Sequence, residues 1–89
     1  MSLSNKLLEN LMEQKSQQPD TQSLFYTAQL PVHFLLAQMK WCLDNDMVGA
    51  DYLKLKNALV ALYGEYEINL LIRRYKQIYR NNIKDTEEV

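Results

Sequence analysis

The sequence predicts an all-α protein, a small bundle of four to five short helices. Only two glycines and two prolines occur among the 89 residues, whereas leucine, lysine, glutamine and glutamate are abundant. A chain built from strands needs a turn about every 8–12 residues, and this chain lacks the residues that form such turns. Apolar residues recur instead at the three-to-four-residue spacing of an α-helix.

The composition indicates a single globular domain covering residues 1–89. A chain of this size buries about 60–70% of its unfolded surface, enough for one modest core. Its longest apolar stretch, residues 31–43, is shorter than the roughly twenty residues that cross a membrane. The formal net charge is only −1, Cys42 is the single cysteine, and residues 1–10 do not resemble a secretory signal. We therefore expect a cytoplasmic protein that makes no contact with membranes.

The first helix is predicted at about residues 4–15, within the segment 1–15. Leucines and a methionine recur there at helical spacing, at Leu3, Leu7, Leu8, Leu11 and Met12. The following residues, 16–22, are polar, lack periodicity and include Pro19, which is typical of a linker. This linker could leave the first helix loosely tethered.

Three further segments follow the linker, and glycine or proline marks their limits. Residues 23–30 could form a short helix that stops before Pro31, because the residue before a proline disfavours the α conformation. Pro31 fits the first turn of the next helix, which Asp44, Asn45, Asp46 and Gly49 end; a single kinked helix through Pro31 is the alternative. A helix over 51–63 would end at Gly64, with Tyr52, Leu55, Leu59, Leu62 and Tyr63 on its buried side.

The last helix is predicted from Glu65 to about Ile83, followed by a frayed tail at residues 85–89. The links between the final helices are short, so we expect the last two to be antiparallel neighbours around Gly64.

The helix predicted at 31–43 is apolar around most of its circumference, and a helix of this kind must be covered on all sides. In one interpretation it is a central helix that its neighbours cover. In the other, a second chain covers part of it, with Phe34 and Trp41 as the anchors, since aromatic side chains are enriched at interfaces.

The sequence carries no set of residues that suggests catalysis or metal binding. His33 is the only histidine, and on one helix it lies about 180° from Cys42, so the two cannot act on one substrate. We expect His33 to be a partly buried packing residue or a cap at the helix start. Residues 44–49 match a calcium loop in part, but Val48 and Leu55 stand where oxygen ligands are needed. We expect neither an enzyme nor a cofactor, a metal or a small-molecule substrate.

The last helix has two distinct faces. Apolar residues fall within an arc of about 140° that would face the core: Ile68, Leu71, Ile72, Tyr75, Ile78, Tyr79 and Ile83. Basic residues share a neighbouring arc of about 80°, namely Arg73, Lys76, Arg80 and Lys84, with Arg74 on the opposite flank. Tyr66 and Leu70 point to the polar side, next to these bases. A solvated face that complements the helix dipole would explain the charges, but exposed apolar groups beside arginines equally favour a contact surface.

These features predict a small interaction protein that acts by binding a protein partner or a second copy of itself, as an adaptor, inhibitor or assembly subunit. The predicted contact residues are Phe34, Trp41, Tyr66, Leu70, Arg73, Lys76 and Arg80. The alternative is a nucleic-acid-binding regulator whose phosphate contacts would be Arg73, Arg74, Lys76, Arg80 and Lys84.

Overall fold

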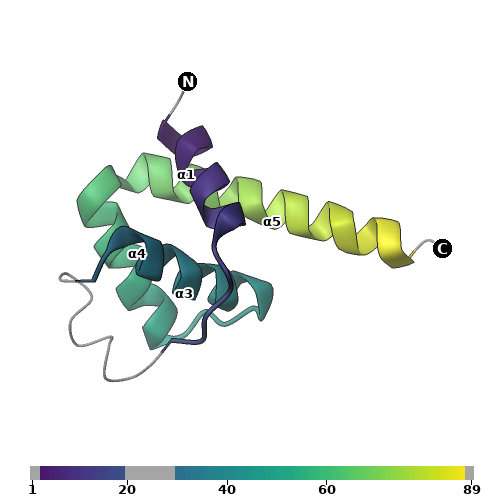
Figure 1. Ribbon diagram of the computed structural model, residues 1–89, viewed down its shortest axis with the longest axis horizontal. Coiled ribbons are helices and arrows are strands. Elements are labelled where there is room, and N and C mark those ends of the chain that lie inside the picture. The colour runs from purple at the N-terminus through teal and green to yellow at the C-terminus, as the bar shows by residue number, and fades with distance from the viewer. Residues whose placement is uncertain (1–2, 20–29, 88–89) are drawn as a thin grey trace.

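The computed structural model describes residues 3–19 and 30–87, and within these ranges the chain forms four helices and no strand. The expected all-α class is therefore confirmed (Figure 1). The helices are α1 (Leu3–Glu13), α3 (Val32–Asp44), α4 (Ala50–Tyr63) and α5 (Glu65–Glu87). The short helix predicted at 23–30 falls almost entirely outside the described residues.

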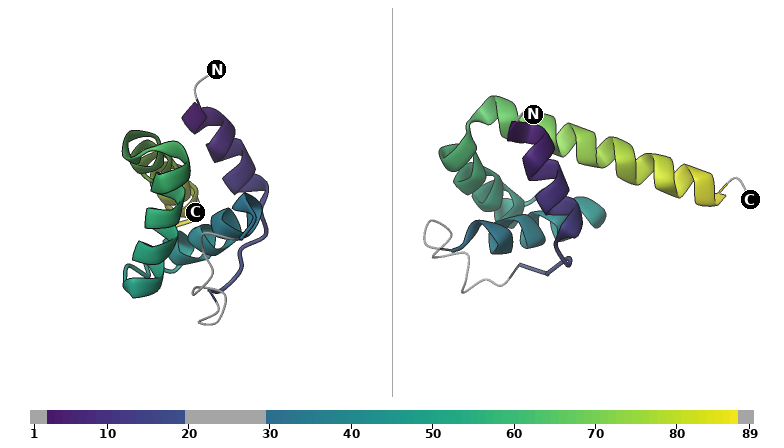
Figure 2. Two further views of the ribbon diagram at one scale, coloured as in Figure 1. Left: turned by 90° about the vertical axis from the view of Figure 1, so that its left-hand side faces the viewer. Right: turned by 45° about the horizontal axis from the view of Figure 1, so that its top comes forward.

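The four helices share one apolar core. Each helix contributes leucine or isoleucine side chains that are almost completely buried, and α3 adds a methionine and the cysteine. The most buried are Leu11, Leu35, Leu36, Met39, Cys42, Leu55, Leu59, Ile68 and Leu71. Figures 1 and 2 show α5 as a long rod whose carboxyl-terminal half extends past the other helices. The buried stripe of α5 therefore lies in its first half, which is where the bundle covers it.

Helix α3 begins one residue later than the sequence suggested. Pro31 is the N-cap, with an extended ψ of 147°, and its carbonyl accepts the first backbone hydrogen bonds of α3, from Phe34 and Leu35. A helix cannot continue through a residue with this ψ value, so the kinked continuous helix is excluded. Proline suits the N-cap because a missing N–H costs nothing at a helix start.

The other end of α3 is closed by backbone hydrogen bonds of the Schellman type. Asn45 donates to the Trp41 carbonyl, and the Met47 N–H reaches back 2.9 Å to the Cys42 carbonyl. Between them Asp46 has a φ of +53°, in the left-handed region. Glycine is the usual residue at this position, but aspartate tolerates it better than most. The predicted end of this helix at residues 44–46 is thus confirmed.

Gly64 both ends α4 and begins α5. Its N–H donates to the Val60 carbonyl at 2.8 Å, and its own carbonyl accepts from Ile68 at 3.2 Å. With φ 95° and ψ 150° it occupies a backbone region that is essentially restricted to glycine. The antiparallel arrangement predicted around Gly64 is not confirmed, because Figures 1 and 2 show α5 leaving α4 at a steep angle.

Some sequence-based expectations about individual positions need correction. Leu62 continues the buried face of α4 by one turn, yet 56% of it is exposed, because it lies in the last turn beside the Gly64 corner. His33 is exposed, next to the ring of Phe34, rather than partly buried, and the N-cap of α3 is Pro31. Helix α5 continues past Ile83 to Glu87. The fraying of residues 85–89 and the loose tether of the first helix stay predictions.

Lys40 connects the middle of the chain to the end of α1. Its ammonium group donates to the Met12 carbonyl at 3.1 Å and to the Gln14 carbonyl at 2.8 Å. The last carbonyls of a helix lack partners within it and carry partial negative charge, so a lysine is well suited to bind them. Just beyond, the Gln17 N–H donates to the Ala37 carbonyl of α3. The chain that leaves α1 is thereby fixed along α3.

Gly64→Ala should lower the free energy of unfolding by about 1–3 kcal/mol, because alanine at this φ and ψ is strained. A Cβ at Gly64 would have no neighbour within 4 Å, so the loss would come from the backbone alone. Urea unfolding followed by circular dichroism measures it. The control is Gly49→Ala. A Cβ at Gly49 also meets no described atom within 4 Å, but the φ of Gly49 is −81°, which alanine adopts without strain. The stability of this variant should stay within about 0.5 kcal/mol of the wild type. Equal losses in the two variants would contradict this account of the corner.

Lys40→Met should lower the free energy of unfolding by about 1–3 kcal/mol, since it removes two charge-assisted hydrogen bonds while keeping the apolar stem. Amide hydrogen exchange should accelerate first in α1, which loses its link to α3. Lys15→Met is the matched control, because Lys15 is exposed and its loss should change stability by less than about 0.5 kcal/mol. Unchanged exchange in α1 would show that these bonds do not hold it.

Candidate interaction surface

The outward face of α5 presents two apolar side chains and a base in one line. Tyr66, Leu70 and Arg73 follow one another at intervals of four and three residues, which places them side by side on a helix surface. They lie opposite the buried stripe that contains Ile68 and Leu71. Tyr66 is 75% exposed, the highest value among the exposed large apolar or aromatic residues, Arg73 is exposed, and Leu70 is half-buried. We call these three residues the α5 outer face.

The other predicted basic residues have different environments. Arg74 Nη1 donates to Oδ1 of Asn5, so its guanidinium contacts α1. Lys76 is half-buried on the flank toward the core side of the helix. The side chains of Arg80 and Lys84 lie outside the part of the chain that the structure describes. Among described residues, therefore, Arg73 is the predicted base that is exposed and shares a face with the exposed Tyr66.

Two tyrosines fix the middle of α5 against the end of α3. The Tyr75 hydroxyl donates to Oδ1 of Asp44, and the Tyr79 hydroxyl donates to the Asp44 carbonyl oxygen at 3.2 Å. Their rings stack with centroids 6.3 Å apart. Burial, together with the hydrogen bond to Asp44 and the charge of Asp44, raises the pKa of Tyr75 well above its usual value. The α5 outer face is consequently presented from a helix that is held in place on its opposite side.

The two predicted anchors lie on one face of α3, two turns apart, and differ in their surroundings. Phe34 lies in the first turn, 40% exposed, with its ring centroid 4.5 Å from that of His33. Trp41 lies two turns later, half-buried and packed against the core. Neighbours within the same chain bury much of the rest of α3, including Leu35, Leu36 and Met39. The interpretation as a central helix thus accounts for most of its apolar surface.

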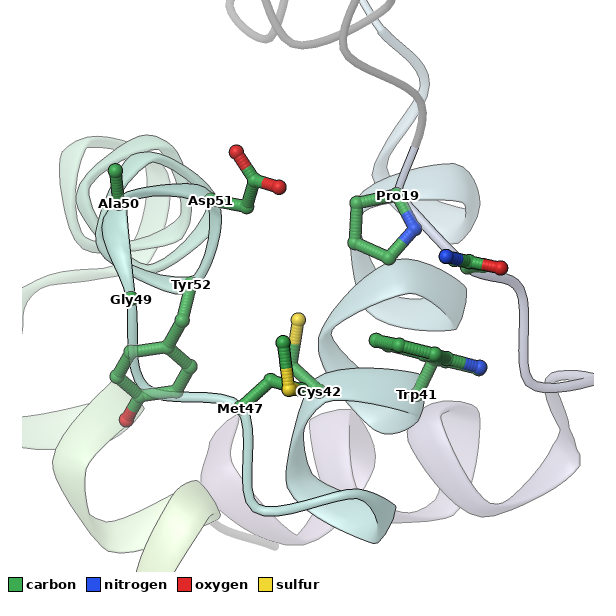
Figure 3. A pocket seen from close by; sticks show the side chains of 9 residues that line it. Pro19, Trp41, Cys42, Met47, Gly49, Ala50, Asp51 and Tyr52 are labelled. Atoms are coloured by element: carbon green, nitrogen blue, oxygen red, sulfur yellow. The ribbon is translucent and has the colours of Figure 1, made fainter.

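Trp41 forms one wall of a pocket of about 290 Å³ between the end of α3 and the start of α4. The lining comes from three stretches of chain, and comprises Gln18, Pro19, Trp41, Cys42, Met47, Gly49, Ala50, Asp51 and Tyr52. Figure 3 shows Trp41 and Pro19 on one side and Tyr52 with Asp51 on the other, with Met47 and Cys42 between them. Burial, and secondarily the Asp51 charge, raises the pKa of the Cys42 thiol.

The pocket and the α5 outer face are two separate places. The pocket lies at the amino end of α4, whereas Tyr66 follows directly after its carboxyl end. A helix of 14 residues is about 21 Å long, so one small contact cannot include both. Of the predicted contact residues, Trp41 lies at the pocket and Tyr66, Leu70 and Arg73 lie on the α5 outer face. Phe34 and Lys76 belong to neither place, and the side chain of Arg80 lies outside the described part of the chain.

Comparison of the chain with family models, with curated proteins and with solved structures gave no significant match in any of the three. The interpretation of these surfaces therefore rests on their geometry. Among the described residues no three histidine, cysteine, aspartate or glutamate side chains gather to hold a metal ion. In the same part of the chain no helix has both the length and the apolar character needed to cross a membrane.

Sequence reasoning missed the pocket and the contacts of Asp44. The pocket combines residues from 18 to 52, and Asp44 meets tyrosines that are 31 and 35 positions away. Helical periodicity reports which face of one helix is apolar, but not which residues of another helix lie opposite. The one signal of the pocket in the sequence was the pair Trp41 and Tyr52. Each ring carries a polar atom that needs a partner or water, so such residues often lie where a core meets the surface.

Raising the pH above about 10 should lower the stability of the folded protein. Tyr75 holds its proton more tightly when folded than when unfolded, so between the two pKa values the folded state binds more protons and stability falls as pH rises. Tyr52, whose pKa burial also raises, contributes in the same direction. Urea unfolding at a series of pH values from about 8 to 11 measures the decline.

Tyr75→Phe should be less stable than the wild type at neutral pH, since it leaves the Asp44 carboxylate without this donor, but it should lose less stability on going to alkaline pH. The control is Tyr66→Phe, an exposed tyrosine that should keep the decline of the wild type. A Tyr75→Phe variant with the same alkaline decline as the wild type would contradict the assignment.

Proposed function

We propose that this protein is a helical binding module that recognises another protein through the α5 outer face, without catalysis. The observation that carries the proposal is the 75% exposure of Tyr66 beside Leu70 and Arg73, on the side of α5 that faces away from the core. Tyrosine and arginine are among the residues that most often dominate binding energies at protein interfaces.

The chemistry of this face indicates the type of partner. Tyr66 and Leu70 would pack against apolar side chains, and Arg73 would pair with a carboxylate in bidentate fashion. From Arg73 to Tyr79 the described part of α5 contains no acidic residue that could neutralise this arginine at the usual helical spacing. We therefore propose a partner segment that combines apolar residues with acidic ones.

The rigidity of α5 also supports the proposal. Binding is stronger when a surface is already held in its bound geometry, because less entropy is then lost. Tyr75 and Tyr79 fix α5 to Asp44, and Arg74 ties it to α1 through Asn5. These contacts lie behind or beside the α5 outer face and leave it open.

A protein partner accounts for this face better than nucleic acid does. A phosphate-binding surface needs several unpaired bases, whereas among the bases whose side chains the structure describes Arg74 contacts Asn5 and Lys76 is half-buried. The two residues that lead the outer face are apolar or aromatic, and the chain carries a net charge of −1. The nucleic-acid alternative is retained as one outcome of the experiment.

The test is affinity capture from the native host with wild-type protein and with Tyr66→Ala and Arg73→Glu. If the α5 outer face binds a protein, each variant should weaken recovery of the same partner about tenfold or more, as expected for residues that dominate an interface. Both residues are exposed, so circular dichroism and the unfolding midpoint should stay unchanged.

Two substitutions elsewhere serve as matched controls. Leu53→Ala removes an apolar side chain from a 52% exposed position on α4, and Lys15→Glu reverses an exposed charge after α1; both should retain the partner. Sedimentation of the purified chain shows whether the partner is a second copy, since Tyr66→Ala would then shift a dimer to monomer.

Oligonucleotide titration at several salt concentrations completes the test. Binding that weakens steeply with salt and disappears in Arg73→Glu would replace the protein partner by nucleic acid. Capture that is identical for all variants would refute the α5 outer face as the contact surface.

A further inference from the structure

The pocket between α3 and α4 has the lining of a site for an organic cation. Its walls include two aromatic rings, Trp41 and Tyr52, and the polarizable thioether of Met47. The face of an aromatic ring is electron-rich and attracts ammonium groups. Among the described lining residues there is no lysine, arginine or histidine, and their one charged side chain is Asp51.

The Asp51 carboxylate is the main charge at this pocket, because the partial charges of the two nearby helix ends nearly cancel. The carboxyl end of α3 carries a partial negative charge and the amino end of α4 a partial positive charge of similar size. Both ends lie here, at Asp44 and Ala50, so their effects largely cancel. Asp51, in the first turn of α4, then adds a full negative charge. Its influence extends into the pocket, since it contributes to the raised pKa of the Cys42 thiol.

The two aromatic rings and the Asp51 carboxylate border the same pocket. Trp41 and Tyr52 stand on opposite sides of the pocket, and the Asp51 carboxylate lies at its edge (Figure 3). The volume of about 290 Å³ is at the lower end of the range of ligand pockets. It suits a compact head group. The pocket is also lined by backbone that has little freedom, because Met47 and Asn45 are hydrogen-bonded to the end of α3.

We propose that this pocket binds an alkylated ammonium group, with Trp41 and Tyr52 as its aromatic walls and Asp51 as its counter-charge. The ammonium can belong to a free small molecule or to a methylated lysine side chain of another protein. This site is independent of the α5 outer face, about one length of α4 away, so either proposal can fail without the other.

Trp41 provides the measurement, because it is the only tryptophan of the chain and lines the pocket. Its fluorescence is followed during titration with choline and, separately, with 3,3-dimethyl-1-butanol, a neutral molecule of the same shape. Ionic strength is kept constant with sodium chloride. Choline should give a saturable change and bind about tenfold more tightly than the neutral compound, in line with cation–π and charge attraction in a partly buried site.

The decisive variant is Asp51→Asn, which removes the charge from an exposed residue and should leave the fold intact. It should weaken choline binding about three- to tenfold and leave the response to the neutral compound unchanged. The control is Asp46→Asn, because Asp46 is an acidic residue of the preceding loop that does not line the pocket. This variant should change choline binding less than twofold. Circular dichroism confirms that both variants fold.

A short peptide with trimethyl-lysine, compared with its unmodified lysine form, distinguishes the two sources. Tighter binding of the trimethylated peptide than of choline supports a protein side chain as the ligand, and the reverse order supports a free small molecule. The proposal is overturned if neither charged probe gives saturable binding, if the neutral compound binds as well as choline, or if Asp51→Asn and Asp46→Asn have equal effects.

Discussion

The burial of α3 is the constraint on which the rest of this structure depends. A helix with apolar residues around most of its circumference is stable only if it is covered from several directions, and a chain of 89 residues has few elements available. Here α1, α4 and α5 all contribute to the core that contains Leu35, Leu36 and Met39. The chain that follows α1 contacts part of the remaining surface of α3, where Gln17 donates to the Ala37 carbonyl and Lys40 of α3 donates to the Gln14 carbonyl. Lys40 thus holds one of the covering segments in place.

The same constraint has a cost that is visible at Gln38. This side chain is 3% exposed, and its Oε1 atom has no hydrogen-bond partner among the residues that the structure describes. A buried acceptor without a partner destabilises a protein by about 1–3 kcal/mol. The hydrogen bonds made at the two ends of α3, by Pro31, Asn45, Met47 and the tyrosines of α5, offset part of that loss. Stability in this chain therefore depends on helix ends as well as on its core.

How far the sequence determined the structure differs between local and long-range features. The helix limits at Asp44 and Gly64 follow from residues that act on their own backbone, and they were predicted. So was the buried stripe of α5 at Ile68, Leu71, Ile72 and Tyr75, although Tyr79, predicted in the same stripe, is exposed and Ile78 is only half-buried. The corner angle between α4 and α5 was not, because Gly64 permits many directions and packing selects one. Leu62 shows the same limit, since periodicity cannot tell where a neighbouring helix stops covering a face. Of the candidate site, the exposed side of α5 could be predicted from the helical period, whereas the pocket required the three-dimensional arrangement.

Cys42 gives the chain a built-in chemical reporter of its own folding. The thiol is 1% exposed, and burial raises its pKa, so the reactive thiolate is both rare and shielded in the folded protein. Although Cys42 borders the pocket, its low exposure means that thiol reagents would modify it mainly when α3 separates from its neighbours. A cysteine placed on the surface could therefore carry a dye for single-molecule work without replacement of the native one, and the slow labelling of Cys42 would report how often the core opens.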